Sequence, residues 1–349
     1  MPTNRPLEDL QAAVGESTRS VEGLRVEAGT VAEFARAIHA DHPPHRDPAA
    51  AERAGHPAVV APLTFVRTAD FPHHRTESVG THKHYGHELG FDERFEVHGE
   101  ESFEYHRPLY VGDVLSGETT LADVYTREGG SGEMTFVDLE TVYRDGDGNP
   151  VVTQRTTTLE LTDLAREAGE SDDRDGDTGS PVPENADVGD PRVPAAAHTE
   201  YPTGAGGNGR VSAGDLSEGD RGPTRVLSGL KRTDFVRYAG ASGDFNPIHY
   251  DEPYAMGAGN PSVFGQGMLV SGFVSTVLVE WFGVAPVERF ATRFENRIWP
   301  GDTVEVTSTI DSLADGERTT TAEVALTAEN DDGETLVTAT ADVELPREG

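Results

Sequence analysis

The feature that most constrains the fold of this chain is an internal repeat. Residues 31–59 match residues 235–263 at a constant offset of 204 positions and without a gap. Identical pairs include Ala35 and Ala239, Pro43 and Pro247, His45 and His249, Asp47 and Asp251, and Gly55 and Gly259. An offset held over about 30 residues predicts two copies of one fold in a single chain.

The second copy contains a dense polar motif. Residues 239–251 place Asp244, Asn246 and His249 within six positions. The residue before a proline avoids the helical region, so the Asn-Pro pair predicts a sharp turn after a short helix. Such a turn alone is typical of a helix stop, but this one brings a carboxylate beside an imidazole. That pair can hold and polarise a water molecule near neutral pH.

An apolar segment follows the motif. Residues 266–281 are apolar almost all round, which predicts a buried helix. Gly267 lies at its start, where the first amides have no intrahelical partner and the helix dipole is positive. A glycine also allows a ligand oxygen to approach the backbone closely, so this amide is a candidate oxyanion site. The alternative is a glycine that only eases helix packing.

The first copy lacks these groups. At the matched positions, Ala40 stands in place of Asp244 and Leu63 in place of Gly267, although His45 is kept. We therefore expect the first copy to be degenerate, shaping the site of the second without carrying its chemistry.

After the helical part of each copy, apolar and polar residues alternate with period two, which predicts antiparallel strands. The segments are 101–108, 114–127, 132–143 and 150–161, then 289–298, 304–313, 318–330 and 335–345. A sheet with one apolar face must bury it against another layer, and the apolar helix is the available partner. The fold class is thus α+β. In the first copy the corresponding helix is short, over 62–68.

The motifs resemble the MaoC-like family of hydratases, the R-specific enoyl-CoA hydratases. The family pattern is Asp-x-Asn-Pro-[Ile/Leu]-His followed by His-Gly-Met-Leu; the chain reads Asp244-Phe-Asn-Pro-Ile-His249 and Gln266-Gly-Met-Leu269. The resemblance covers residues 225–345, and Gln266 departs from the family histidine. It implies two hotdog domains, each an antiparallel sheet wrapped around a central helix, paired as a pseudodimer.

The resemblance also implies a division of labour for hydration of a 2-enoyl-CoA thioester to a 3-hydroxyacyl-CoA. Asp244 and His249 would hold the water, the Gly267 amide would bind the enolate oxygen, and Asn246 would brace the loop. No metal or redox cofactor is required. The expected partner is a CoA thioester, and a homodimer of the chain is one possible assembly.

Length and layout further resemble the mesaconyl-CoA hydratases, so mesaconyl-CoA to β-methylmalyl-CoA is the leading substrate hypothesis. A straight-chain R-specific enoyl-CoA hydratase is one alternative, and a non-catalytic acyl-CoA-binding module is another. A hotdog thioesterase needs a carboxylate on the long helix, and residues 267–279 offer none.

The charge balance limits the environment and the partners. The chain has 62 acidic and 28 basic residues, a net charge of −34, which predicts a halophile-type surface; an acidic mesophilic protein is the alternative. Nucleic acid is not expected, because phosphate binding needs clustered Lys or Arg. An anionic CoA needs a local arginine patch, and Arg293 and Arg297, predicted on one strand face, could provide it or pair with surface carboxylates.

Other features are consistent with a cytoplasmic protein. There is no cysteine, no apolar run long enough to cross a membrane, and no apolar signal core at the start. The predicted division is a degenerate domain over 1–165, an acidic Gly/Pro-rich linker over 166–222 and a catalytic domain over 223–349.

Two local features complete the predictions. A His-rich loop over 73–98 allows a metal site at His82, His84 and His87, but a polar loop near the substrate tunnel is favoured. Thr30 with Glu33 predicts a capping box for a helix over 31–38.

Overall fold

The computed structural model describes residues 5–70, 86–92, 94–129, 132–162, 195–201 and 211–347. The helical elements are α1 (Leu7–Ala12), α2 (Ala28–Ala37), η1 (Pro43–His45), α3 (Pro48–Arg53), η2 (Leu63–Ala69), η3 (Ala213–Asp215), α5 (Arg232–Ser242), η4 (Pro247–His249), α6 (Glu252–Gly257) and α7 (Gly267–Phe282). The strands are β1 (Ser17–Arg25), β2 (Glu96–Tyr105), β3 (Val114–Gly129), β4 (Gly132–Arg144), β5 (Pro150–Leu161), β6 (Ala196–Glu200), β7 (Thr224–Ser228), β8 (Val287–Phe294), β9 (Val304–Asp315), β10 (Thr319–Asn330) and β11 (Thr335–Pro346).

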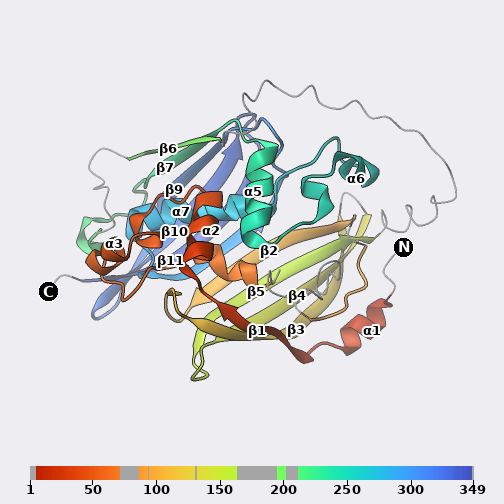
Figure 1. The fold of residues 1–349 in the computed structure, drawn as a ribbon, viewed down its shortest axis with the longest axis horizontal. Coiled ribbons are helices and arrows are strands. Elements are labelled where there is room, and N and C mark those ends of the chain that lie inside the picture. The colour runs from red at the N-terminus through yellow and green to blue at the C-terminus, as the bar shows by residue number, and fades with distance from the viewer. Residues whose placement is uncertain are drawn as a thin grey trace.

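The described strands form one 11-stranded antiparallel sheet in the order β1-β3-β4-β5-β2-β8-β11-β10-β9-β7-β6 (Figure 1). The first copy supplies one half and the second copy the other, joined where β2 pairs with β8. In that pairing Ser102 lies opposite Ala291, its own equivalent at an offset of 189 positions. A residue that faces its equivalent lies on a two-fold axis, so the copies are related as the subunits of a dimer are.

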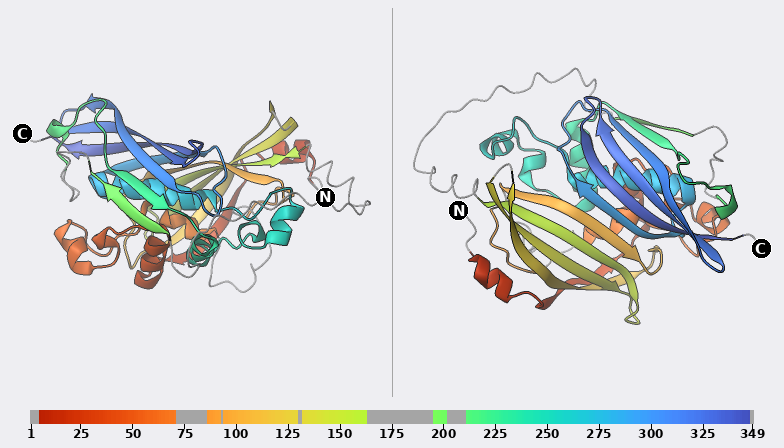
Figure 2. Two further views of the ribbon diagram at one scale, coloured as in Figure 1. Left: turned by 90° about the horizontal axis from the view of Figure 1, so that it is seen from above. Right: turned by 180° about the vertical axis from the view of Figure 1, so that it is seen from behind.

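The two copies differ most in their central helix. In the second copy α7 is buried along almost its whole length and packs against β8, β9, β10 and β11. Figure 2 shows α7, α2 and α5 on the same side of the sheet. In the described residues of the first copy, the short η2 occupies the start of the matched position and ends at Ala69. The two predicted hotdog domains, joined as a pseudodimer, are confirmed.

The offset of 204 also holds in the helices. η1 and η4 begin and end at matched residues, and so do α3 and α6. Asp47 and Asp251 each accept a hydrogen bond at the start of the following helix, from Ala49 N and Tyr254 N. The repeat therefore preserves local capping chemistry as well as the apolar pattern.

Three predictions of local structure were wrong or incomplete. The capping box at Thr30 and Glu33 does not form, because α2 begins at Ala28, so Thr30 lies inside the helix and Glu33 pairs with Arg36 instead. β1 was missed because its residues are mostly exposed and the alternation is weak.

The predicted linker range 166–222 contains ordered structure near its end. β6 pairs with β7 at the edge of the sheet, and Arg221 forms a bridge with Thr309. The acidic segment 166–192 lies outside the described residues. None of the helices in the described part of the chain is long and apolar enough to cross a membrane.

Candidate active site

The polar motif of the second copy is held by a tight turn. α5 ends at Gly243, whose φ of 89° is in the left-handed region that glycine adopts without strain. Asp244 Oδ1 then accepts a hydrogen bond from Asn246 N (3.3 Å), and Asn246 Oδ1 accepts one from Ile248 N (3.1 Å). Asn246 thus caps η4 and braces the turn between the two predicted catalytic groups.

Asp244 and His249 lie side by side. The imidazole Nδ1 is 2.8 Å from Phe264 O, so Nδ1 carries the proton that it donates and Nε2 is left as the reactive nitrogen. Nε2 lies 3.9 Å from Asp244 Oδ2. That gap is too long for a direct hydrogen bond, but one oxygen atom can bridge it. The Asp244 side chain is 18% exposed and the His249 side chain is 10% exposed, so the pair is largely shielded from solvent but not sealed off.

The start of α7 is tied to this turn. Gln266 is buried, and its Nε2 donates to Phe235 O (3.3 Å) and to Asp244 O (3.4 Å). Gln266, which replaces the family histidine, therefore braces the loop without joining the catalytic pair.

Gly267 opens a helix of 16 residues, so its amide N–H has no intrahelical acceptor. A Cβ at this position would lie 2.9 Å from Phe294 Cδ1, which also gives the glycine a packing role. The alternative that this glycine eases helix packing is thus supported. A packing role does not engage the amide N–H, which can still bind a ligand oxygen.

The two predicted substrate-binding arginines do not share a strand face. β8 ends at Phe294, so Arg297 lies beyond the strand, contrary to prediction. Arg293 is exposed and pairs with the carboxylates of Glu100 (3.4 Å) and Glu295 (3.3 Å).

Arg297 instead stacks on an aromatic ring. Its guanidinium lies 5.1 Å from the centre of the Phe264 ring, and that ring packs edge-on against His249 at 5.3 Å. Burial lowers the pKa of Arg297. This arginine therefore supports the wall behind His249.

The first copy keeps the histidine and its scaffold. His45 Nδ1 lies 2.8 Å from Val60 O, the equivalent of the bond made by His249. Ala40 offers no carboxylate in this copy. Burial lowers the pKa of His45 to about 3 and that of its neighbour His42 to about 4, so both are neutral at neutral pH.

The long helix α7 carries a carboxylate one residue beyond the range 267–279. Glu280 lies on α7 and lines the small cavity at His42 and His45. It is paired with the buried guanidinium of Arg225. The carboxylate that a hotdog thioesterase needs is thus present on α7, at the degenerate site and engaged in an ion pair.

Comparisons with known proteins match both halves of the chain. Residues 12–154 match the family described as "FAS1-like, dehydratase domain region", and residues 219–331 match the "MaoC like domain". The chain therefore combines a FAS1-like dehydratase region in its first half with a MaoC-like domain in its second half. A solved "MaoC-like dehydratase" is 29% identical, with a TM-score of 0.72 over 96% of this chain and 99% of that one.

Further relatives of this double MaoC-like chain are known. A UPF0336 protein of Clavibacter michiganensis is 40% identical over 127 residues, which is 36% of this chain and 78% of the relative. Another from Saccharopolyspora erythraea is 32% identical over 147 residues, 42% and 88% of the two chains. A Mycobacterium tuberculosis structure described as a double hotdog fold shares the fold at 13% identity, with a TM-score of 0.58 over 98% of each chain.

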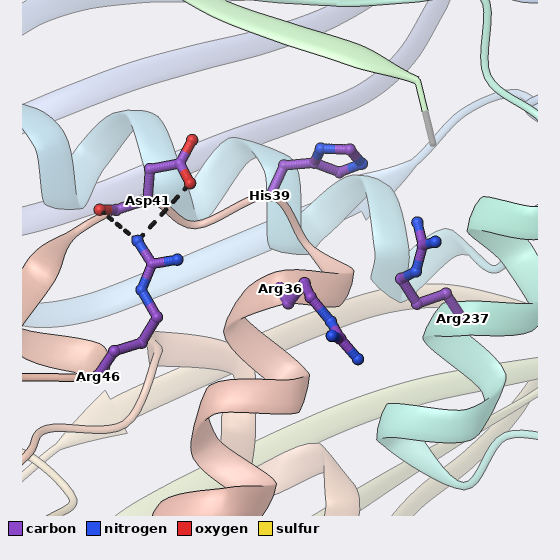
Figure 3. A pocket seen from close by; sticks show the side chains of 5 residues that line it. All are labelled: Arg36, His39, Asp41, Arg46 and Arg237. Atoms are coloured by element: carbon purple, nitrogen blue, oxygen red, sulfur yellow. Dashed lines mark hydrogen bonds and ion pairs between the residues drawn. The ribbon is translucent and has the colours of Figure 1, made fainter. Parts of the chain in front are cut away.

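Sequence reasoning missed a basic cavity in this MaoC-like chain. It has a volume of about 280 Å³ and is lined by Arg36, His39, Asp41, Arg46 and Arg237 (Figure 3). Arg46 donates to the Asp41 backbone oxygen at 3.0 Å, and Arg237 lies 3.4 Å from Asp234. The residues come from α2, its following loop and α5, so no local motif joins them in the sequence.

A buried charged cluster was also missed. Arg67 on η2 pairs with Asp70 and lies 4.0 Å from Glu101 on β2. Glu101 accepts hydrogen bonds from Thr156 Oγ1 at 3.0 and 3.1 Å and lies 2.9 Å from His98 Nε2. Burial opposes the charge on Arg67, but Asp70 and Glu101 outweigh it and raise its pKa.

The metal site considered in the His-rich loop lies mostly outside the described residues. His82 and His84 are not described, and His87 is buried with its Nε2 3.1 Å from Thr119 O. Within the described part of the chain, no group of three or more His, Asp or Glu side chains is arranged to hold a metal ion.

Proposed function

We propose that the chain catalyses the reversible hydration of a 2-enoyl-CoA thioester to a 3-hydroxyacyl-CoA at the second copy. The observation that carries the proposal is the Asp244 and His249 pair, with reactive atoms 3.9 Å apart in a shielded site. The match of residues 219–331 to the MaoC like domain, and the similarity to a solved MaoC-like dehydratase, support the same reaction class.

The mechanism follows from this pair. A water oxygen bridges Asp244 Oδ2 and His249 Nε2 and attacks the β-carbon of the thioester. One group accepts a proton from the water as the C–O bond forms, and a proton returns from the pair to the α-carbon on the same face. The electrons of the double bond pass briefly to the thioester oxygen. The Gly267 amide, at the positive end of α7, stabilises that enolate oxygen.

The anionic end of CoA needs a cationic surface in a chain of net charge −34. Arg293 is engaged by two carboxylates, which leaves it a weak candidate. The cavity lined by Arg36, Arg46 and Arg237 brings three guanidinium groups together, and each of them pairs with one carboxylate, of Glu33, Asp41 and Asp234 respectively. We assign the phosphates of CoA to this cavity as part of the proposal.

Which acyl group the substrate carries is a separate and more specific question. Resemblance of layout favours mesaconyl-CoA, and a straight-chain enoyl-CoA is the alternative. A non-catalytic acyl-CoA-binding module is the competing function, but it has no need for Asp244 and His249 to be held together.

The experiment is a hydration assay on mesaconyl-CoA, crotonyl-CoA and a medium-chain enoyl-CoA, followed by loss of the conjugated thioester absorbance. It is run in dilute buffer and in about 2 M KCl, because screening relieves the self-repulsion expected of the acidic surface. Hydration of any substrate that Asp244→Asn abolishes supports the proposal. Binding without turnover by folded wild-type protein would instead establish the binding module.

A further inference from the structure

The charged cluster around Arg67 lies beside the proposed thioester site. The position of Gly267 is in contact with the ring of Phe294, and that ring lies 4.6 Å from the ring of His98. His98 Nε2 is 2.9 Å from Glu101 Oε2, which neighbours Arg67. A short path of side-chain contacts thus joins the start of α7 to the cluster.

The cluster contains side chains that differ between the two copies. η2 has seven residues where α7 has 16. At matched positions η2 carries Arg67 and Thr68, whereas α7 carries Ser271 and Gly272. Where the second copy has small side chains, the first copy therefore places a charge and a hydroxyl at the junction between the two domains.

Three buried hydroxyls near this junction have no hydrogen-bond partner among the described residues: Thr64, Thr68 and Tyr238. They are 0%, 3% and 1% exposed. A buried polar group without a partner is costly, and such groups commonly face a ligand or an ordered water.

Of these three residues, Tyr238 lies nearest to Asp244 along the chain. It lies on α5 six residues before Asp244, and it packs on Phe34 at 5.9 Å. Burial raises its pKa, and the charges of Arg67 and Asp244 both act on its hydroxyl. The buried hydroxyl is therefore close enough to both the cluster and Asp244 for their charges to act on it.

The cluster has no spare positive charge. Arg67 is opposed by Glu101 and by the ionised fraction of Asp70, so no net positive charge is left for a further carboxylate. Burial raises the pKa of Asp70 to about 7, so near neutral pH part of this carboxyl group is protonated and can donate a hydrogen bond. An uncharged oxygen is the ligand that suits both features.

We propose that this junction recognises an uncharged hydroxyl or carbonyl group on the acyl chain of the thioester, with Tyr238 as a specificity-determining residue. The inference rests on the proposed function, because it assigns the acyl end of the same substrate. It favours a neutral, oxygen-bearing acyl group over the dicarboxylic mesaconyl group.

The test compares hexenoyl-CoA with the same chain bearing a terminal hydroxyl, and adds mesaconyl-CoA. Both kcat/KM and the calorimetric Kd are measured for wild type, Tyr238→Phe and Thr68→Val. Tyr143→Phe is the control for a partnered hydroxyl at the same cluster: the equally buried Tyr143 hydroxyl already donates to Gln154 Oε1 at 2.7 Å, and Asp70 and Arg67 act on it as they act on Tyr238.

Wild type should prefer the hydroxylated chain, and Tyr238→Phe should reduce that preference by roughly 3- to 10-fold, mainly through KM, as loss of one hydrogen bond predicts. Its Tm should stay unchanged or rise, because the removed hydroxyl has no partner among the described residues and is costly to bury. Tyr143→Phe should keep the preference and lower the Tm.

Equal use of both chains by wild type, or an unchanged preference in Tyr238→Phe, would overturn the inference while leaving hydration established. A strong preference for mesaconyl-CoA would overturn it as well, by showing that the junction accepts a charge. If no thioester is hydrated, the proposed function fails, and the Kd ratios still decide the role of Tyr238.

Discussion

The two copies hold their histidines in the same way. His249 Nδ1 and His45 Nδ1 each lie 2.8 Å from the backbone oxygen of matched residues, Phe264 and Val60. Only the second copy adds a carboxylate, where Ala40 stands in the first. The comparison separates the scaffold, which the repeat preserves, from the chemistry, which depends on a few side chains.

The catalytic carboxylate is the largest difference between the copies. Asp244→Asn keeps the shape of the turn and removes the charge, so kcat for enoyl-CoA hydration should fall by about 1000-fold, within the range for loss of a general base. Asp251→Asn is the matched control: Asp251 caps α6, and asparagine caps a helix equally well. Activity of Asp244→Asn within about tenfold of that control would remove Asp244 from the mechanism.

The matched histidines test the comparison directly. In an asparagine variant Nδ2 takes the place of the imidazole Nδ1, so His249→Asn and His45→Asn both keep the backbone hydrogen bond and lose Nε2. We expect His249→Asn to lower kcat by about 100-fold and His45→Asn to stay close to wild type. Steady-state kinetics on the same thioester decides this, and similar losses in both variants would show that the first copy takes part in catalysis.

How much of this could be read from the sequence depended on distance along the chain. The repeat predicted two copies of one fold, the period-two alternation predicted most of the strands, and the motif predicted Asp244, Asn246 and His249, because these signals are local in sequence. The cluster of Arg67, Glu101 and Thr156 was not predictable, since Glu101 meets Thr156 only through the pairing of β2 with β5 and Arg67 approaches from η2.

Local signals also misled where tertiary packing decided the outcome. Thr30 and Glu33 have the spacing of a capping box, yet α2 starts earlier, as its counterpart α5 does at the matched Arg232. β6 was hidden in a segment of linker-like composition, because its strand pairing with β7 supplies the order that its own residues do not.

Glycine in place of leucine is the second difference between the copies. Gly267→Ala would place a methyl group 2.9 Å from Phe294 Cδ1, and such overpacking should cost about 1–3 kcal/mol of stability and slow turnover by moving the amide. Gly240→Ala on α5 is the control, because its methyl group meets nothing within 4 Å. Denaturant unfolding and kcat are measured together. Wild-type values for Gly267→Ala would exclude the packing role of this glycine.

The buried His45 of the first copy should make the stability of the protein depend on pH. The folded-state pKa of His45 is lowered by burial from 6.5 to about 3, so below pH 6.5 the unfolded chain binds a proton that the folded chain refuses. Stability is therefore unaffected above pH 6.5 and falls as the pH drops toward the folded-state pKa. His45→Asn removes this penalty, so between about pH 7 and pH 5.5 it should lose about 1 kcal/mol less than wild type. Urea unfolding of both proteins at each pH measures the difference. An identical loss of stability in both proteins would mean that His45 binds its proton in the folded state. That result would contradict the burial of His45 in this structure.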